Sequence, residues 1–320
     1  MWELSYFSKT TLLFSSLLYY SSMSVLAQAT HDSSPGKGTI VCHNYGSKTK
    51  FSRITAQYPL KFVPSQGHYE KIAVAHMLSS GTTSGDHLDI SVELQANSNL
   101  LLLTRGSNKP SGCTAATPPS PPLDATTIAE DGDMGTFNLK GSSQTVRATL
   151  TPTSTLIVLP SATHFRAASH FSHQSYYLQS DGRATSQLVL LDWRTAISRE
   201  DMWHSSQLDI YMDRYPIVRD NMLIADGLPG NKGPQCFATL IIIASPDAKD
   251  SLQVGVTALR GLPNTSDQHL RWTMQSIPNG VLVRIAGATT DGVREFVKSV
   301  CLKGHIENII GNGLFDGILS

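Results

Sequence analysis

The residues best suited to chemistry lie in the segment LLDWRTAISREDMW, which runs from Leu190 to Trp203. Its three carboxylates, Asp192, Glu200 and Asp201, suggest an acid and a base. Such a pair needs a fixed separation and pKa values that the surroundings drive apart. Asp192 ends an aliphatic run and could be partly buried, whereas Glu200 and Asp201 lie in a polar loop. No positioned nucleophile accompanies them, so the residues alone do not support a hydrolase or another enzyme.

A histidine cluster is the second candidate for chemistry. The segment HFRAASHFSH contains His164, His170 and His173. Imidazole suits nickel, copper or zinc, but the cluster lacks Cys or carboxylate partners, so surface histidines in a polar loop are the better explanation. The sequence has no G-x-S-x-G elbow, HExxH motif or GxxxxGK[ST] loop. The segment SGTTSG, residues 80–85, is followed by no lysine and therefore predicts a turn rather than a phosphate loop.

Composition excludes several classes of protein. The 320 residues include 25 Lys and Arg and 25 Asp and Glu, which gives a formal net charge of zero. No basic block is present, so nucleic acid is not an expected partner. Four isolated cysteines without a CxxC pair exclude a disulfide-dense scaffold. A surface without net charge tends to associate, which favours a protein that works in a complex.

The N-terminal region allows two interpretations. The stretch TTLLFSSLLYYSSMSVLAQA is apolar and ends in an A-x-A cleavage pattern at residues 27–29. Its serines make it too polar for a membrane span, so no stable membrane association is expected. Residues 1–29 could be the signal peptide of a secreted protein, with which the sequon at Asn264 is compatible. Alternatively, the protein is cytoplasmic. Residues 1–36 are then either an N-terminal extension or the result of a wrongly chosen start codon.

Short strands dominate the rest of the chain. HLDISVEL alternates, which places Leu88, Ile90, Val92 and Leu94 on one face of a strand. NLLLLT, TLIVLP, QLVLLDW, ATLIIIAS and GVLVRIAG are aliphatic runs between turn residues. Runs of this length suit strands that are buried on both faces. We find no internal repeat.

Helices are predicted only towards the C-terminus. In TTDGVREFVKSVCLKGH, one apolar face of a helix holds Val293, Phe296, Val297, Val300 and Cys301, with Thr290 or Asp291 as the N-cap. ASPDAKDSLQVGVTAL predicts a weaker helix. We therefore expect a mainly β, β-rich domain over residues 37–315 with one or two α-helices. Residues 110–127, rich in Pro, Ser and Thr, are expected to be a disordered or extended insertion.

The order of eight segments carries a family resemblance. SRITAQYPLKFVPS is followed by LSSGTTSGDHLDISVEL and ANSNLLLLTRGSNKP. Later come FRAASHFSHQSYYL, LVLLDWRTAISREDMW, IVRDNMLI, CFATLIII and GVLVRIAGATTDGVREFV. This succession resembles the urease accessory protein UreD family, called UreH in some bacteria, in its fungal form. The resemblance covers about residues 37 to 310, and it rests on the ordered set rather than on any single motif.

Individual positions carry over from the family pattern. They are Tyr58, Pro59, Leu60 and Lys61 of a YPLK element, Gly85 and Asp86 after a glycine-rich segment, Thr104, Gly106, Ser107 and Lys109 of a T-x-G-S-x-K element, Asp192, Trp193 and Trp203, and the pair Arg219 and Asp220. Tight turns would also explain the glycines, and packing would explain the tryptophans. Asp86 and Asp192 could cap backbone amides instead of contacting a metal. The loop between the tryptophans lacks the family's glycines, which leaves its role open.

The resemblance implies a non-enzymatic scaffold with a β-rich, helix-poor fold. Family members bind apo-urease and the accessory protein UreF, which recruits the GTPase UreG, and the assembly passes nickel to urease through a proposed internal tunnel. Nickel is then a transient cargo, and no organic cofactor is expected. Candidate path ligands are Asp86, Asp192 and Glu200, because scattered oxygen ligands would let a divalent ion leave. A secreted β-rich binding protein of unknown ligand is the alternative.

Overall fold

The computed structural model describes residues 34–65, 71–79, 85–106, 141–160, 169–195, 203–225, 234, 236–246, 250–263 and 269–319. Residues 34–320 form one compact unit. Most of the expected extension at residues 1–36 and the whole expected insertion at residues 110–127 lie outside the described residues. No helix in the described ranges is long and apolar enough to cross a membrane.

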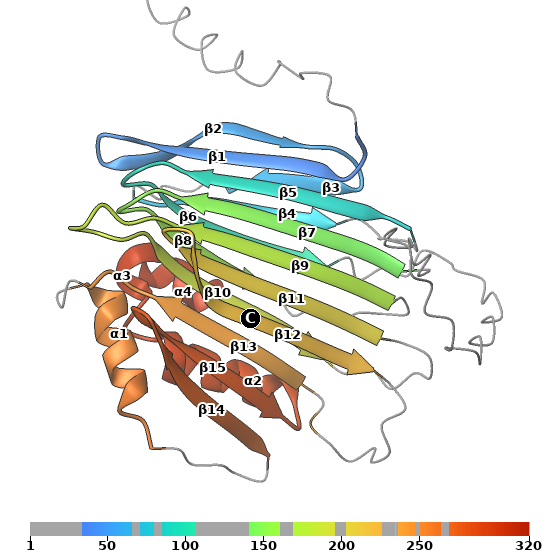
Figure 1. The fold of residues 1–320 in the computed structure, drawn as a ribbon, viewed down its shortest axis with the longest axis vertical. Coiled ribbons are helices and arrows are strands. Elements are labelled where there is room, and N and C mark those ends of the chain that lie inside the picture. The colour runs from blue at the N-terminus through green and yellow to red at the C-terminus, as the bar shows by residue number, and fades with distance from the viewer. Residues whose placement is uncertain are drawn as a thin grey trace, which may run out of the picture. The chain divides into compact units, whose positions relative to one another are not determined.

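Two β-sheets build this unit (Figure 1), which confirms the predicted mainly β fold. Sheet A contains β1 (Lys37–Tyr45), β2 (Lys48–Ala56), β5 (His87–Leu94), β7 (Gly141–Leu150), β9 (Ser169–Leu178), β11 (Trp203–Met212) and β12 (Tyr215–Ala225). Sheet B contains β3 (Leu60–Pro64), β4 (Ala73–Ser79), β6 (Asn99–Gly106), β8 (Thr155–Pro160), β10 (Gln187–Thr195), β13 (Cys236–Ile243), β14 (Leu270–Ile277) and β15 (Gly280–Gly287). The strand order is β12-β11-β9-β7-β5-β1-β2 in sheet A and β14-β15-β13-β10-β8-β6-β4-β3 in sheet B.

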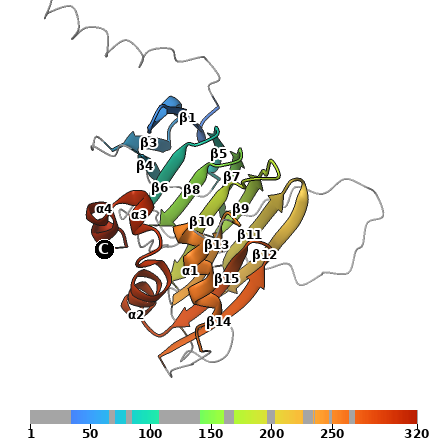
Figure 2. The same ribbon diagram turned by 90° about the vertical axis from the view of Figure 1, so that its left-hand side faces the viewer.

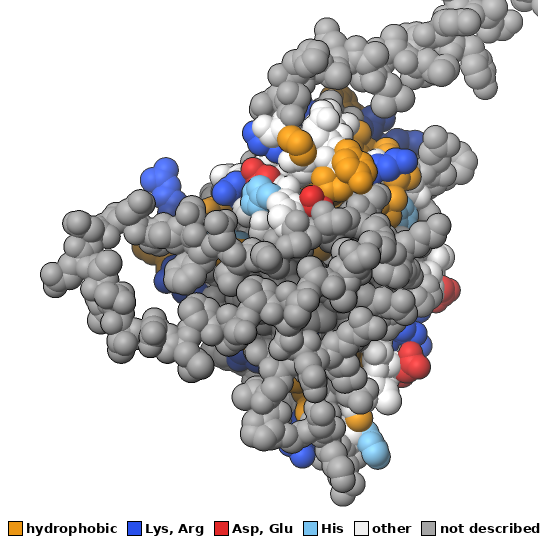
Figure 3. Space-filling view, turned by 90° about the vertical axis from the view of Figure 1, so that its right-hand side faces the viewer, with side chains coloured by type: hydrophobic (Ala, Val, Ile, Leu, Met, Phe, Trp, Pro, Cys, Tyr) orange, Lys and Arg blue, Asp and Glu red, His pale blue; other side chains and the backbone are white. Residues whose placement is uncertain are grey.

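The middle of the chain winds between the sheets in successive coils. From β4 to β11, each strand lies in the opposite sheet from the strand before it. Within each sheet, the strands of successive coils pair in parallel. The last residues of the strands of sheet B and the first residues of the following strands of sheet A therefore lie at the same end of the sheets, and this end faces the viewer in Figure 3.

The opposite ends of the coils carry a repeated turn. Ser98, Ser154 and Ser186 each come directly before a strand of sheet B and are fully buried. Their backbones continue the ladder from coil to coil, because the amide of Thr155 donates to the carbonyl of Ser98 at 3.0 Å and that of Gln187 to the carbonyl of Ser154 at 2.8 Å. The sequence shows no internal repeat, and the repetition lies in the path of the chain. The backbone hydrogen bonds repeat from coil to coil, and almost any apolar strand can form them.

The central strands of sheet B are buried on both faces, and β10 shows how. Leu188 and Leu190 face sheet A and belong to a core between the sheets. Val189, Leu191 and Trp193 point the other way and belong to a second core beneath the helices. Side chains of a strand alternate between its two faces, so the uninterrupted apolar run reflects two cores. Sheet A behaves differently: its strand β5 buries Leu88, Ile90, Val92 and Leu94 and exposes the residues between them more, as the alternation predicted.

Helices cover the face of sheet B that points away from sheet A (Figure 2). They are α1 (Ser251–Arg260), α2 (Thr290–Glu295), the π-helical segment η2 (Phe296–Leu302), α3 (Glu307–Ile310) and α4 (Asn312–Gly317). Both predicted helical regions are therefore confirmed. Asp250 caps α1, and its carboxylate accepts a hydrogen bond from the amide of Leu252 at 2.8 Å.

Two details of the C-terminal helix were wrong. The N-cap is Thr289, whose extended backbone and hydroxyl suit a cap, and not Thr290 or Asp291. Its hydroxyl accepts from the amide of Gly292 at 3.2 Å. Val300 is 40% exposed, although an α-helical period placed it on the apolar face. The wider turn of the π-helical segment spaces the buried positions four apart, at Val293, Val297 and Cys301, and turns Val300 outward.

Candidate functional site: a buried polar layer between the sheets

An ion pair on β10 begins the candidate site. Asp192 and Arg194 follow Leu190 on the side of the strand that faces sheet A. Their side chains are only 7% and 10% exposed, and Nη2 of Arg194 lies 2.8 Å from Oδ1 of Asp192. The other carboxylate oxygen, Oδ2, accepts a hydrogen bond from the hydroxyl of Ser206 on β11 at 3.1 Å. This charged pair of sheet B is thus linked to sheet A through Ser206.

Two histidines of sheet A complete the contact with the guanidinium. His170 on β9 and His204 on β11 lie opposite each other in the parallel ladder, and their rings stack at 5.4 Å between centroids. Nε of Arg194 donates to Nε2 of His204 at 2.7 Å. Nδ1 of His170 lies 2.8 Å from the hydroxyl of Ser142 on β7. We call these six residues, Ser142, His170, Asp192, Arg194, His204 and Ser206, the polar layer.

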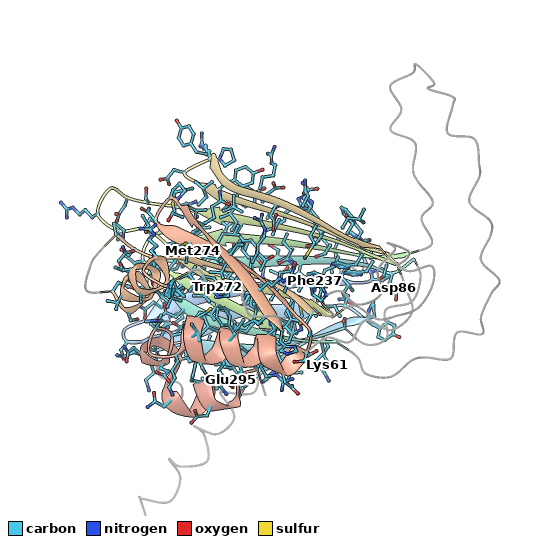
Figure 4. All side chains as sticks on the ribbon, turned by 90° about the horizontal axis from the view of Figure 1, so that it is seen from below. Lys61, Asp86, Phe237, Trp272, Met274 and Glu295 are labelled. Carbon is cyan, nitrogen blue, oxygen red and sulfur yellow. The ribbon has the colours of Figure 1, made fainter. Side chains whose placement is uncertain are left out.

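The polar layer lies at the end of the sheets where the chain crosses from sheet B to sheet A. Ser142, His170 and His204 form a row across neighbouring strands. Asp86 directly precedes β5, and its carbonyl accepts from the amide of Ser143 at 2.9 Å, which extends this row by one strand. With about 4.8 Å between strands, Asp86 and His204 are about 14 Å apart. Figure 4 shows Asp86 at this end of the structure, away from Trp272 and Met274.

A second set of polar groups lies deeper between the sheets. The hydroxyl of Tyr176 donates to Oε1 of Gln174 at 2.8 Å, and both residues are buried. The hydroxyl of Ser172 is buried and has no hydrogen-bond partner among the described residues. A buried polar atom without a partner is uncommon in proteins. Polar chemistry therefore extends from the strand ends into the space between the sheets, until the aliphatic core begins.

Burial and the guanidinium set the protonation of the layer. Burial, followed by the charge of Arg194, lowers the pKa of His170 to about 4. Burial, Arg194 and then His170 lower the pKa of His204 to about 2. Both imidazoles are therefore neutral at physiological pH, and in His204 the lone pair of Nε2 accepts the N–H of Arg194. Burial and Asp192 together raise the pKa of the Tyr176 hydroxyl, which stays protonated.

The arrangement fits binding better than catalysis. The described residues contain no group of three or more His, Cys, Asp or Glu side chains that could hold a metal ion. Burial raises the pKa of Cys42 and Cys301 to about 12 and that of Cys236 to about 11, so these thiols are poor nucleophiles at neutral pH. The layer offers imidazole and carboxylate groups, which are ligand types that a borderline divalent cation prefers, but the described residues do not gather enough of them in one place to hold an ion.

The structure brings together only part of the predicted site. Asp192 lies in the polar layer, and Asp86 lies at the end of its row of residues. Glu200 is outside the described residues, as are Asp201, Ser107 and Lys109. The histidine cluster does not assemble: His164 is not described, and His173 lies on the opposite face of β9 from His170, where its Nε2 is 3.3 Å from Oδ2 of Asp209.

The remaining family positions are scattered. Tyr58 is 78% exposed and Lys61 is exposed, whereas Pro59 is buried. Gly85 has a φ of +96°, which confirms a turn that favours glycine. Thr104 and Gly106 lie in β6, and Trp203 is the first residue of β11.

Trp193 is 1% exposed and packs in the core beneath the helices. Arg219 and Asp220 point to opposite sides of β12. Arg219 lies 3.1 Å from Asp209, and Asp220 lies 2.8 Å from Arg284 of sheet B. The packing interpretation therefore holds for Trp193, and Arg219 and Asp220 do not act as one unit.

Sequence reasoning missed four members of the polar layer: Ser142, Arg194, His204 and Ser206. The available signal was the alternation of side chains along a strand, which places every second residue on the same face. In LVLLDWR, Arg194 falls on the same face as Asp192, and in WHSSQLDI, His204 and Ser206 fall on the same face as Leu208 and Ile210. An inward-facing polar residue in an otherwise apolar row marks a site, once the inward face is known.

Comparison with known proteins decides the family. The model of the UreD urease accessory protein family matches residues 34–308, which is most of the chain. The chain belongs to the UreD family. A similar UreD-type relative is urease accessory protein 4 of Cryptococcus neoformans var. grubii, 23% identical over an alignment that covers 88% of this chain and 94% of the relative. Both findings support an accessory role in the urease system, and the UreD family is one of accessory proteins rather than of catalysts.

Proposed function

We propose that this chain is a scaffold in urease maturation, which binds apo-urease and the other accessory proteins and assists nickel insertion. The observation that carries this proposal is the family match over residues 34–308, together with an accessory-protein relative of nearly the same extent. Its partners are then homologues of UreF and UreG together with apo-urease. Nickel is a cargo that passes through the complex, and no organic cofactor takes part.

The polar layer is the part of the proposed scaffold that nickel would contact. Asp86 and Asp192 offer carboxylate oxygens, and the stacked pair His170 and His204 offers neutral nitrogens. Oxygen and imidazole ligands suit divalent nickel without the thiolates that would hold it tightly. The layer lies beside the strand ends rather than in the aliphatic core, which supports an entry route from that end. Glu200 belongs to the connection between β10 and β11 and stays a candidate ligand of the same route.

A cytoplasmic location accompanies this proposal, because urease maturation takes place there. Residues 1–36 are then an extension ahead of a UreD-like domain at residues 37–315, with an insertion at residues 110–127. The signal-like residues 1–29 motivate the secreted alternative. N-terminal sequencing of the native protein separates the two proposals, because secretion predicts a mature chain that starts near Thr30.

Complementation tests the function directly. A strain that lacks its own copy of this gene should contain urease protein that is inactive and poor in nickel. The full chain, and a version that starts at residue 37, should both restore urease activity and the nickel content of purified urease. Full urease activity in the deletion strain would overturn the proposal. Asp192→Asn should lower the rescue, whereas Asp291→Asn, a change of an exposed aspartate, should leave it intact.

A further inference from the structure

The hairpin of β1 and β2 is a basic element at one edge of sheet A (Figure 1). Residues 34–64 contain five Lys or Arg side chains and no Asp or Glu, although the whole chain has 25 basic and 25 acidic side chains. Four of the five cations lie on the two strands of the hairpin and are exposed: Lys37, Lys48, Lys50 and Arg53. The outward-facing carboxylates next to the hairpin, Asp89 and Glu93, lie on β5, which β1 separates from β2.

The register of the hairpin places Lys48, Lys50 and Arg53 on one outer face. Their partners in the ladder are every second residue of β1, in the order Tyr45, His43 and Val41. Cys42, between the last two, is buried in the core, so these partners and the three cations point outward. A register shift at Cys42 accommodates the three-residue step from Lys50 to Arg53. The Nζ of Lys50 lies 5.7 Å from the centre of the Tyr45 ring, which is 57% exposed.

The inner side of β2 is apolar and incompletely covered. Phe51, Ile54 and Ala56 pack against the core between the sheets but stay partly exposed. In the described part of the chain, β2 pairs only with β1, so its other edge offers backbone N–H and C=O groups. A strand added at this edge would satisfy these groups and cover the three apolar side chains.

The opposite edge of sheet A is less suited to an added strand. β12 carries charges of both signs, Arg219 and Asp220, and Asp220 points inward, where it lies 2.8 Å from Arg284 of sheet B. Inward-pointing charges protect a sheet edge from strand addition, and the inner side of β2 has none. The lysines of β2 disfavour pairing with the same edge of a second copy, because like charges opposite each other are destabilising, but they favour a strand of opposite charge.

We propose that the free edge of β2 binds an extended segment of a partner protein in which acidic and apolar residues alternate. The segment adds one strand to sheet A. Its carboxylates lie beside Lys48, Lys50 and Arg53, because these side chains share the outer face. Its apolar side chains point to the other face and cover Phe51 and Ile54.

The size of the basic row favours a protein segment over a nucleic acid. DNA-binding proteins often contact about 6–10 phosphates, whereas the outer face of β2 has three cations. Binding of a segment to the hairpin does not depend on a role in urease maturation. Failed complementation would leave the binding edge standing, and failed peptide binding would leave the proposed function standing.

Fluorescence anisotropy with the purified full-length chain tests this binding. The probe is a labelled peptide of about eight residues, the length of one strand, in which glutamate and valine alternate. We expect saturable binding that weakens with added salt. Arg53→Glu turns an attractive pair into a like-charge pair and should weaken binding at least about threefold. Arg271→Glu, the same change at an exposed residue of the edge strand β14, should alter binding by less than about twofold.

Altered peptides separate strand addition from simple attraction between charges. A peptide with a central proline keeps the charges but loses a backbone donor, and it should bind at least about tenfold more weakly. A peptide of the same composition, with its glutamates and valines in two separate blocks, should bind as weakly, because only alternation puts all carboxylates on one face. Equal binding of the alternating, proline and block peptides would overturn the proposal.

A charge swap guards against misfolding. The triple variant Lys48→Glu, Lys50→Glu and Arg53→Glu should lose the acidic peptide and instead bind a peptide in which lysine replaces glutamate. Arg53→Glu alone should shift the preference in the same direction to a smaller extent. An unchanged preference in both variants would contradict the proposal. So would a dimer of the wild-type chain that the acidic peptide dissociates in sedimentation experiments, because a second copy would then be the occupant of the β2 edge.

Discussion

The ion pair between Asp192 and Arg194 allows a quantitative test of the polar layer. Both side chains are at most 10% exposed, and Asp192 also accepts a hydrogen bond from Ser206. Removing one member of a buried pair leaves the other charge buried without a partner, which costs about 3–5 kcal/mol. Asp192→Leu and Arg194→Met should each lower the free energy of unfolding by that amount.

The double variant should lose much less free energy of unfolding than the two single variants lose together. Apolar replacement of both members leaves no buried charge, and such replacements are often neutral in stability. Ser206 and His204 each lose a hydrogen-bond partner, which adds about 1–3 kcal/mol for each group. The costs of the two single variants sum to about 6–10 kcal/mol. We therefore expect a cost of about 2–6 kcal/mol for the double variant and, at the middle of both ranges, a coupling of about 4 kcal/mol between the two sites.

Urea unfolding followed by tryptophan fluorescence measures this cycle, since Trp193 is the direct neighbour of both residues. The control is the surface pair Asp291 and Arg294, which lie 3.1 Å apart with side chains 86% and 30% exposed, and its coupling should not exceed about 0.5 kcal/mol. Additive costs of Asp192→Leu and Arg194→Met, with no coupling beyond that of the control, would refute the buried ion pair.

Three further predictions follow from burial and backbone geometry. Burial lowers the pKa of the stacked histidine pair below the unfolded value of about 6.5, so the unfolded chain binds more protons. The stability present above about pH 6.5 should therefore fall towards pH 4 by about 1 kcal/mol per histidine and pH unit, and glutamine at both positions should flatten this pH profile of urea midpoints. Val297→Ala should cost about 1.5 kcal/mol, because the side chain is fully buried, whereas Val300→Ala should change thermal stability by less than about 0.5 kcal/mol. Equal losses at both positions would contradict the π-helical spacing. Gly85→Ala should destabilise by about 1 kcal/mol because its φ is +96°, whereas Gly313→Ala should stabilise by up to about 1 kcal/mol, and in neither case does the added Cβ meet another atom within 4 Å.

Much of the fold could be predicted from local patterns. Alternation in HLDISVEL gave the inner face of β5, and aliphatic runs gave the strands of sheet B. These signals are local, because a strand buried on one face or on two faces needs a distinct pattern of side chains. The parallel pairing of successive coils was not predictable in this way. It joins residues far apart in the sequence, and the short motif of a buried serine before each aliphatic run was too weak to indicate it.

Of the polar layer, only Asp192 and His170 were among the residues predicted from the sequence. Asp192 stands out, since a charge that ends an aliphatic run must find a partner or reach water. Its partners depend on register, because β9 and β11 must pair before His170 and His204 can stack. A shift by one residue would turn both histidines to the opposite face. The histidine cluster misled for the same reason, since neighbours in the sequence point to opposite faces of one strand.

The coiled path of the chain also has a consequence for how fast it folds. From β4 to β11, no two consecutive strands pair with each other, so this region cannot begin as a local hairpin. The chain must close a long loop before each pairing forms, and such topologies fold slowly, often in milliseconds to seconds or longer. Hairpins exist only at the margins, for example β1 with β2 and β14 with β15. During this delay, the apolar strands of sheet B have unpaired edges that can aggregate. Refolding from urea at low and high protein concentration should therefore give yields that fall steeply with concentration.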